Sequence, residues 1–357
     1  MGSKQTQTGL SFTRETFARL SPHPYLLAHL QQSSPSAPSR ANGRAPNQFR
    51  PPHINRGSLT HAEGSAVVRI GDTTVVCGVR GEILLASKVA GLRIEKTLTT
   101  QSSLRNGCSD AQKLDLLVPN IELATGCSPN FLPGLPPSTL AQSLSSRIYA
   151  LLHSCRLIDS EDLKIWYQPP DLCGPNQKMD LDNDEDQTKQ INDDSEIKGF
   201  WTLYIDILFI SLDGNPFDAA WIAVLSALMD TKLPKAYWDP DLETILCHDE
   251  ISLSKKLQLR GLPIATTAVI FRAKDKSHQQ TRDNNHWVLI DPDTFEESLC
   301  DESVTITVDL STNERKILGI TKSGGTVVGP KQINDITSCA EKRWYRAQKN
   351  HLSIQRM

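Results

Sequence analysis

The stretch that most constrains the fold begins as a strand, turns on a glycine and continues directly into an apolar helix. It reads WTLYIDILFISLDGNPFDAAWIAVLSALM: a strand pattern over 201–212, the turn at Asp213-Gly214, and a helix pattern over 216–229. The first N–H groups of a helix have no partner within it, so such a turn can bind an anion. If this turn binds phosphate, the chain can be an enzyme. If it does not, the chain keeps an enzyme's fold without its activity.

Strand and helix patterns follow one another along the rest of the chain without a long strand–helix–strand series. Residues 64–83 read as two alternating strands joined at Gly71-Asp72, a hairpin signal. Ser138 is expected to cap a helix over 139–154, and a last helix is expected over about 330–351. Further strands are expected at 162–168, 266–272, 286–291, 303–309 and 315–320. Two rounds of paired strands plus helices predict an α+β fold.

Two segments lack the patterns of a packed core. Residues 1–48 are predicted to be an N-terminal extension, partly helical over 11–31 and then a flexible linker rich in Pro, Ser and Gly. Residues 49–357 are predicted to form one domain. Within it, the acidic stretch 169–199 cannot bury enough apolar surface to order itself, so we expect a disordered insertion inside a hairpin.

Composition and cysteine spacing argue against several classes of protein. The chain has 38% hydrophobic and 22% charged residues, as soluble globular proteins do. Its eight cysteines include no C-x-x-C pair, so no zinc knuckle or redox dithiol is predicted, and no metal or cofactor is expected. No apolar run approaches the length that crosses a bilayer, so no membrane partner is expected.

The first sixty residues are basic, with Glu15 as their single acid. A basic arm is typical of a protein that meets a polyanion such as RNA, and equally of a solvated extension. A monomeric RNA-binding module would also need aromatic stacking platforms. The aromatic residues of this arm are scattered and form no recognition motif, so this alternative is the less favoured one. They are Phe12, Phe17, Tyr25 and Phe49.

Several separate stretches, in matching order, resemble the RNase PH family of phosphate-using 3′-exoribonucleases and their inactive relatives. The stretches are FRPPHINRGSLTHAEGSAVVRIGDTTVVCGVRGEI, VPNIEL, SLDGNPFDAAWIAVLSAL, DPDTFEE and GITKSGGTVVGPKQINDITSCA. The resemblance runs from about Arg44 to Leu352, with the acidic insertion unmatched. The DGNxxDAA form of the turn is its most specific feature.

The resemblance implies an RNase PH-type fold (ribosomal protein S5 domain 2-like) and a place in the six-membered ring of the eukaryotic RNA exosome. Such a ring is built from related RNase PH-like chains and is capped by S1/KH-type RNA-binding subunits. RNA passes through it to separate nucleases during rRNA maturation and mRNA turnover. The implied localisation is the nucleus, the nucleolus and the cytoplasm.

The turn itself departs from the pattern of active relatives. They resemble one another in having a further glycine, a small hydroxyl residue and an arginine after the Asp-Gly, where this chain has Asn215, Pro216 and Phe217. Proline deletes an N–H that the anion would use, and phenylalanine replaces the guanidinium with an apolar ring. Asp218 then adds negative charge. We therefore predict a degenerate phosphate site and a non-catalytic subunit.

Active relatives also carry an acid pair spaced six apart, and this chain retains Asp291 and Glu297 at matching positions. A carboxylate pair is a common acid/base device. The alternative interpretation is a strand-to-loop junction whose acids are solvated or cap backbone N–H groups. Without a phosphate site we favour this structural interpretation. A phosphate-dependent 3′-exoribonuclease with a composite site at a subunit interface stays the alternative function.

Candidate RNA contacts are few. Relatives carry basic residues in the loop before the first long helix, but the matching stretch CSPNFLPGLPPS has no lysine or arginine. Arg93, Lys96 and Arg105 lie upstream and are the candidate contacts to backbone phosphates.

Overall fold

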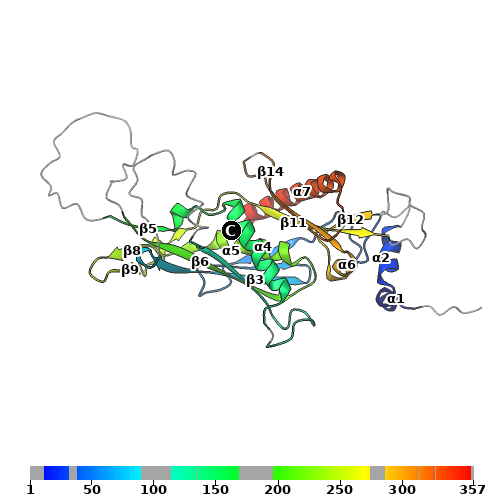
Figure 1. Cartoon of the computed structure of the whole chain (residues 1–357), viewed down its shortest axis with the longest axis horizontal. Coiled ribbons are helices and arrows are strands. Elements are labelled where there is room, and N and C mark those ends of the chain that lie inside the picture. The colour runs from blue at the N-terminus through cyan, green and yellow to red at the C-terminus, as the bar shows by residue number, and fades with distance from the viewer. Residues whose placement is uncertain are drawn as a thin grey trace, which may run out of the picture.

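The largest sheet of the computed structural model carries the turn at the end of its longest strand (Figure 1). The structure describes residues 12–31, 38–89, 114–134, 136–168, 196–273, 286–312, 314–325 and 327–354. In this sheet the order is β1-β2-β3-β6-β4, with β5 pairing along the first part of β6. Only the β4–β6 pairing is parallel. Its strands are β1 (Pro52–Arg56), β2 (Gly64–Ile70), β3 (Thr73–Leu85), β4 (Leu117–Leu123), β5 (Lys164–Tyr167) and β6 (Glu196–Ser211).

A second, four-stranded sheet has the order β12-β11-β13-β14 and is antiparallel throughout. Helix α7 (Pro330–Ile354) packs against its central strands. Helix α6 (Thr294–Leu299) follows β12 and begins with a capping box between Asp293 and Glu296. The strands are β11 (Ile264–Arg272), β12 (His286–Ile290), β13 (Glu302–Asp309) and β14 (Lys316–Ser323).

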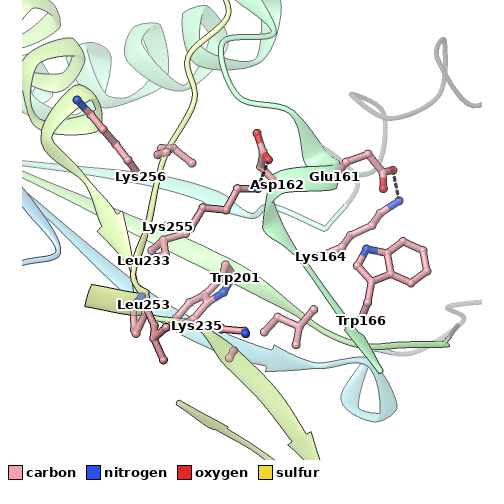
Figure 2. Close-up of a pocket in the computed structure, with 14 residues that line it drawn as sticks. Glu161, Asp162, Lys164, Trp166, Trp201, Leu233, Lys235, Leu253, Lys255 and Lys256 are labelled. Atoms are coloured by element: carbon pink, nitrogen blue, oxygen red, sulfur yellow. Dashed lines mark hydrogen bonds and ion pairs between the residues drawn. The ribbon is translucent and has the colours of Figure 1, made fainter. Parts of the chain in front are cut away.

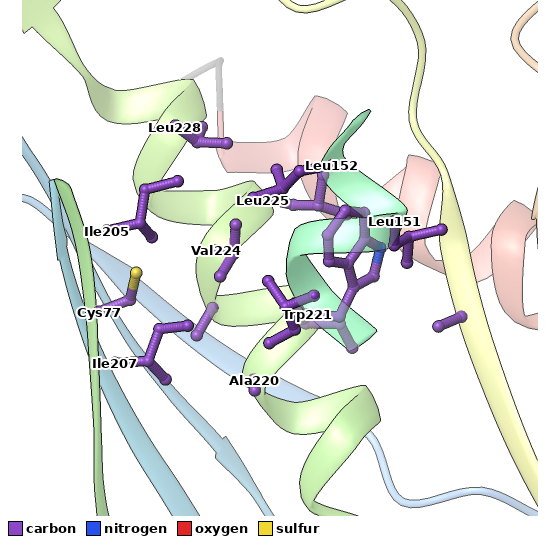
Figure 3. Packing of buried hydrophobic residues seen from close by; sticks show 14 of the residues in the cluster. Cys77, Leu151, Leu152, Ile205, Ile207, Ala220, Trp221, Val224, Leu225 and Leu228 are labelled. Carbon is purple, nitrogen blue, oxygen red and sulfur yellow. The ribbon is translucent and has the colours of Figure 1, made fainter. Parts of the chain in front are cut away.

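Helix α5 (Pro216–Asp230) lies in the core between the two sheets, because it contacts β2 and β3 on one side and β11 on another. Every residue from Phe217 to Leu228 is buried, as expected of a helix that is apolar all round. Its Trp221 packs beside Leu151 and Leu152 of α4 (Thr139–Cys155), and Val224 faces strands β3 and β6 (Figure 3). The core therefore holds the helix that starts at the turn.

Smaller elements lie at the two ends of the long axis (Figure 1). The hairpin of β8 (Ala236–Asp239) and β9 (Thr244–Cys247) lies beside β5 at one end. Helices α1 (Arg14–Leu20) and α2 (Pro22–Leu30) lie at the other end. The remaining short elements are β7 (Lys232–Leu233), β10 (Lys255–Lys256), η1 (Ala86–Lys88), η2 (Ser160–Leu163) and η3 (Ile251–Leu253).

The predicted α+β class and its two rounds of paired strands are confirmed. The hairpin at Gly71-Asp72 forms as expected, and Ala66, Val68 and Val75 on its inner face are wholly buried. The Ser138 side chain accepts the N–H of Ala141 and so caps α4 as predicted. Alternation and capping chemistry were sufficient for these elements because both act locally.

Two predicted boundaries need correction. The linker predicted to be flexible is anchored over 38–48, because Arg40 is fully buried there. The expected insertion of 169–199 is too long by four residues, since β6 already begins at Glu196 and pairs with Tyr167 of β5. That antiparallel pairing places the insertion within a hairpin, as expected; 169–195 itself lies outside the described residues.

The division into an extension (1–48) and one domain (49–357) stays a prediction, although one core cluster includes side chains from both sheets. None of the described helices is long and apolar enough to cross a membrane.

Candidate functional site

The turn between β6 and α5 has a backbone conformation that depends on its glycine. Gly214 has a φ of 71° and Asn215 a φ of 48°, both in the left-handed region. A Cβ at Gly214 would lie 2.5 Å from the carbonyl carbon of Asp293, so a larger residue would collide with the loop before α6. The hydroxyl of Thr73 accepts the N–H of Asp213 and donates to the carbonyl of Gly214. The turn is thus fixed by hydrogen bonds to Thr73 and by close packing against the loop before α6.

The N-terminus of α5 is occupied by a carboxylate of this chain. The N–H of Asn215 donates to Oε1 of Glu297 at 2.7 Å, and Pro216 has no N–H to offer. Glu297 therefore occupies the position where a phosphate oxygen would accept a hydrogen bond at a helix start. Burial raises its pKa to about 7, and the hydrogen bond from Asn215 only partly opposes this.

Asp291 lies beside Glu297 but is bound by Arg50. Its side chain is fully buried, and Oδ1 and Oδ2 accept Nη2 and Nε of Arg50, each at 2.9 Å. The backbone N–H of Arg50 and the amide of Asn215 also donate to Asp291, both at 2.8 Å. Burial would raise the pKa of Asp291, but Arg50 outweighs it and holds the pKa at about 2. The acid is ionised and bidentately paired.

The expectation that the two acids are solvated or cap backbone N–H groups holds in its second form for both. Glu297 accepts the N–H of Asn215, and Asp291 accepts the N–H of Arg50. Asp291 is not solvated, because it closes a buried ion pair across the turn. The Asp291 oxygens accept hydrogen bonds from Arg44, Arg50 and Asn215, all of this chain.

Asp218 points into the core and not toward the mouth of the turn. Its oxygens accept the hydroxyl and the N–H of Thr267 at 2.8 and 3.0 Å, and Arg343 of α7 forms an ion pair with it. The amide of Asn215 adds a further donor at 2.9 Å. The prediction that Asp218 places negative charge where an anion would dock is wrong, because its charge is neutralised inside the protein.

Phe217 stands where active relatives are expected to have an arginine, and an arginine from another helix covers it. The guanidinium of Arg147, on α4, lies 4.0 Å from the centroid of the Phe217 ring. Its Nη2 donates to the hydroxyl of Thr305 at 2.9 Å, and burial lowers the pKa of Arg147. A cation stacked on a ring and bonded to a core strand is held in place.

Sequence reasoning missed three arginines of the N-terminal arm: Arg50, described above, and Arg40 and Arg44. Arg40 is fully buried, forms an ion pair with Glu296 at 3.1 Å and donates to the carbonyl of Asp291. Arg44 donates to the same carbonyl at 3.0 Å. Burial lowers the pKa of Arg40 to about 10. The only sequence signal was an excess of arginine without acids, which does not say where each one docks.

Other site predictions are not brought to this turn. Arg93, Lys96 and Arg105 lie outside the described residues. Among the residues that the structure describes, no group of His, Cys, Asp and Glu could hold a metal ion. Five ion pairs between described residues join eight charged side chains around the turn: Arg40–Glu296, Arg44–Asp291, Arg50–Asp213, Arg50–Asp291 and Arg343–Asp218.

Comparison with known proteins shows which family the chain resembles. The first domain model of the 3′ exoribonuclease family (RNase PH) matches residues 48–234, and the second domain model matches 261–343. The chain is 30% identical to exosome complex component rrp43 of Schizosaccharomyces pombe over 335 residues, covering 94% of this chain and 97% of that protein. It is 26% identical to exosome complex component Rrp42 of Archaeoglobus fulgidus, covering 89% of this chain and 92% of that one.

The fold is shared with a solved structure described as an Archaeoglobus fulgidus exosome with RNA bound to the active site. The TM-score is 0.59 at 22% identity, with 92% of this chain and 97% of that chain covered. A chain of an archaeal exosome core superposes with a TM-score of 0.56. The resemblance inferred from sequence motifs is thereby confirmed, and this chain belongs to the 3′ exoribonuclease family of RNase PH.

Proposed function

We propose that this chain is a structural subunit of the RNase PH-like ring of an RNA exosome. Nearly full-length similarity to proteins named exosome complex components supports this, as does the fold shared with archaeal exosome chains. The chain would assemble with other RNase PH-like ring subunits and with S1/KH-type caps. It would help thread RNA to separate nucleases in rRNA maturation and mRNA turnover, in the nucleus, nucleolus and cytoplasm.

The subunit is non-catalytic under this proposal. The observation that carries it is the hydrogen bond from the N–H of Asn215 to Glu297, next to Pro216, which has no N–H. Phosphorolysis needs a bound phosphate as nucleophile and donors that stabilise the charge of the transferred group. Here the N–H and the side-chain amide of Asn215 are bonded to carboxylates of the chain itself, and the N–H of Asp213 is bonded to the hydroxyl of Thr73.

The assembly is tested by recovering the complex that forms on an affinity-tagged version of this chain in its native cells. The expected result is one copy of this chain among several related RNase PH-like chains and cap proteins, read from intact mass. A homohexamer or a solitary chain would reject the ring-subunit proposal.

The loss of catalysis is tested on the same complex with a 3′-hydroxyl RNA and inorganic phosphate. Because another subunit could supply phosphorolysis, wild type is compared with Glu297→Gln, which keeps an oxygen to accept the N–H of Asn215. Equal release of nucleoside diphosphates is expected from both. A specific loss in the variant, with the complex intact, would favour the composite-site exoribonuclease.

A further inference from the structure

A pocket lies beside β5 (Figure 2), which Figure 1 shows toward the end of the molecule opposite the N-terminal helices. Its volume is about 370 Å³, and it is bounded by η2, β5, β6, β7 and β10 together with the segments that follow β7 and precede β10. This is the size range of pockets that bind small ligands or anchoring side chains. No residue of the degenerate turn lines it.

Apolar side chains form the floor and one wall of the pocket. Trp201 lies at its base and is only 6% exposed, whereas Trp166 is 45% exposed and Leu253 is 41% exposed. Large apolar groups left this exposed are costly in water, and their grouping around a hollow marks a binding surface. Leu233, Ile165 and Leu257 complete the apolar lining.

The acids of the rim are already paired. Glu161 bonds to Lys164 at 2.6 Å, and Asp162 bonds to Lys255 at 2.6 Å (Figure 2). Lys235 and Lys256 also line the pocket, are exposed, and have no ion-pair partner among the residues that the structure describes. The rim therefore carries uncompensated positive charge.

A cross-strand contact adds to this positive charge. Lys256 of β10 pairs directly with Lys232 of β7 in the antiparallel register. Like charges opposite one another on neighbouring strands are destabilising, and a negative partner would remove that cost.

We propose that the pocket binds an acidic segment of a partner protein, which inserts one large apolar side chain between Trp166, Trp201 and Leu253. Carboxylates of the same segment would pair with Lys235 and Lys256. Such binding requires neither ring assembly nor catalysis, so it stands apart from the function proposed above.

A protein segment suits the lining better than RNA does. Trp201, at the base of the pocket, is too buried to present its face to a nucleobase, which leaves Trp166 as the one exposed aromatic ring of the described lining. The rim also has lysines without the arginine forks that favour phosphate.

The test is a fluorescence-anisotropy titration of the purified full-length chain with a labelled acidic peptide that has one central leucine. Saturable binding is expected, and it should weaken about tenfold when the leucine becomes alanine. Lys235→Glu combined with Lys256→Glu should weaken it at least as much. Lys331→Glu combined with Lys342→Glu, the same charge change at exposed positions on α7, is the control and should leave affinity unchanged.

Leu253→Asp tests the apolar wall separately from the charges and should also abolish saturable binding. Binding that does not depend on the central leucine, or that survives both pocket variants, would overturn the proposal. Absence of saturable binding would overturn it as well. In a competition titration, an oligouridylate that displaces the labelled peptide at a lower concentration than the unlabelled peptide does would assign the pocket to RNA instead.

Discussion

The turn before α5 and the lysine-rimmed pocket differ in whether their charged side chains have partners within the chain. At the turn, Asp291, Arg50 and Glu297 are bonded to partners from other elements of the same chain. At the pocket, Lys235 and Lys256 have no such partner among the described residues, and Lys256 faces another lysine. A site whose charges are satisfied internally contributes to folding, whereas one with unsatisfied charge is suited to binding. Removing a charge should therefore have opposite effects in the two regions.

The largest effect is expected for Asp291→Asn. Asparagine tolerates the left-handed backbone at this position, where φ is 54°, so the change removes charge with little strain. It removes the buried carboxylate that Arg50 pairs with and leaves only the more exposed Asp213, which should lower the free energy of unfolding by about 3–5 kcal/mol at pH 7. Urea unfolding measures this loss. Glu82→Gln, which breaks an exposed pair with Arg80, is the matched control and should cost under about 0.5 kcal/mol.

The pKa of Asp291 also sets the pH range of that effect. A carboxyl whose folded pKa of about 2 lies below its unfolded value of 3.8 contributes stability that is complete above the unfolded value. The difference between wild type and Asp291→Asn should therefore shrink as the pH falls from 4 to 2. A difference that stays constant over this range would contradict the ion-pair assignment.

Glu297→Gln should change the pH dependence of stability with the opposite sign. The folded pKa of Glu297, about 7, lies above its ordinary value of 4.5, so the folded state retains the proton over that interval. Wild type should lose stability relative to the variant as the pH rises from 5 to 8, by at most about 3 kcal/mol. Thermal or urea unfolding across this range checks it. Glu122→Gln, at an exposed position on β4, should show no such slope.

A double-mutant cycle on Arg40 and Glu296 sharpens the picture of the anchored arm. Arg40→Met leaves the buried Glu296 with only Arg44, 3.8 Å away, as a cation, and Glu296→Gln leaves Arg40 without its ion-pair partner. The double variant should lose less free energy of unfolding than the two single variants lose together, with a coupling energy of about 2 kcal/mol. Additive losses would show that the arm is not held by this ion pair.

The smallest effect is expected at the pocket. Lys256→Ala removes one member of the opposed lysine pair, so it should raise the free energy of unfolding by about 0.2–0.5 kcal/mol at low salt. Added salt should erase the gain, because it screens exposed charges. Destabilisation by this variant would mean that the pocket's charges are satisfied internally after all.

Much of the fold was predictable because local rules govern it. Alternation identified the hairpin at Gly71-Asp72, and a serine cap identified the start of α4. The short helix α6 was missed, since DPDTFEE carries too few residues for a helical period, although its capping box is legible in Asp293 and Glu296. Short strands such as β7 and β10 have two residues each and leave no periodic signal.

In the candidate site, too, some features were predictable from local sequence and others were not. The sequence alone determined that Pro216 has no N–H and that Phe217 cannot clamp an anion, because these are properties of the residues themselves. Only the tertiary structure decided that Glu297 bonds to the N–H of Asn215, 82 residues earlier, and that Arg40 reaches a carbonyl 251 residues away. A buried charge must find a partner, but burial and three-dimensional proximity choose which one, and neither is written in local sequence.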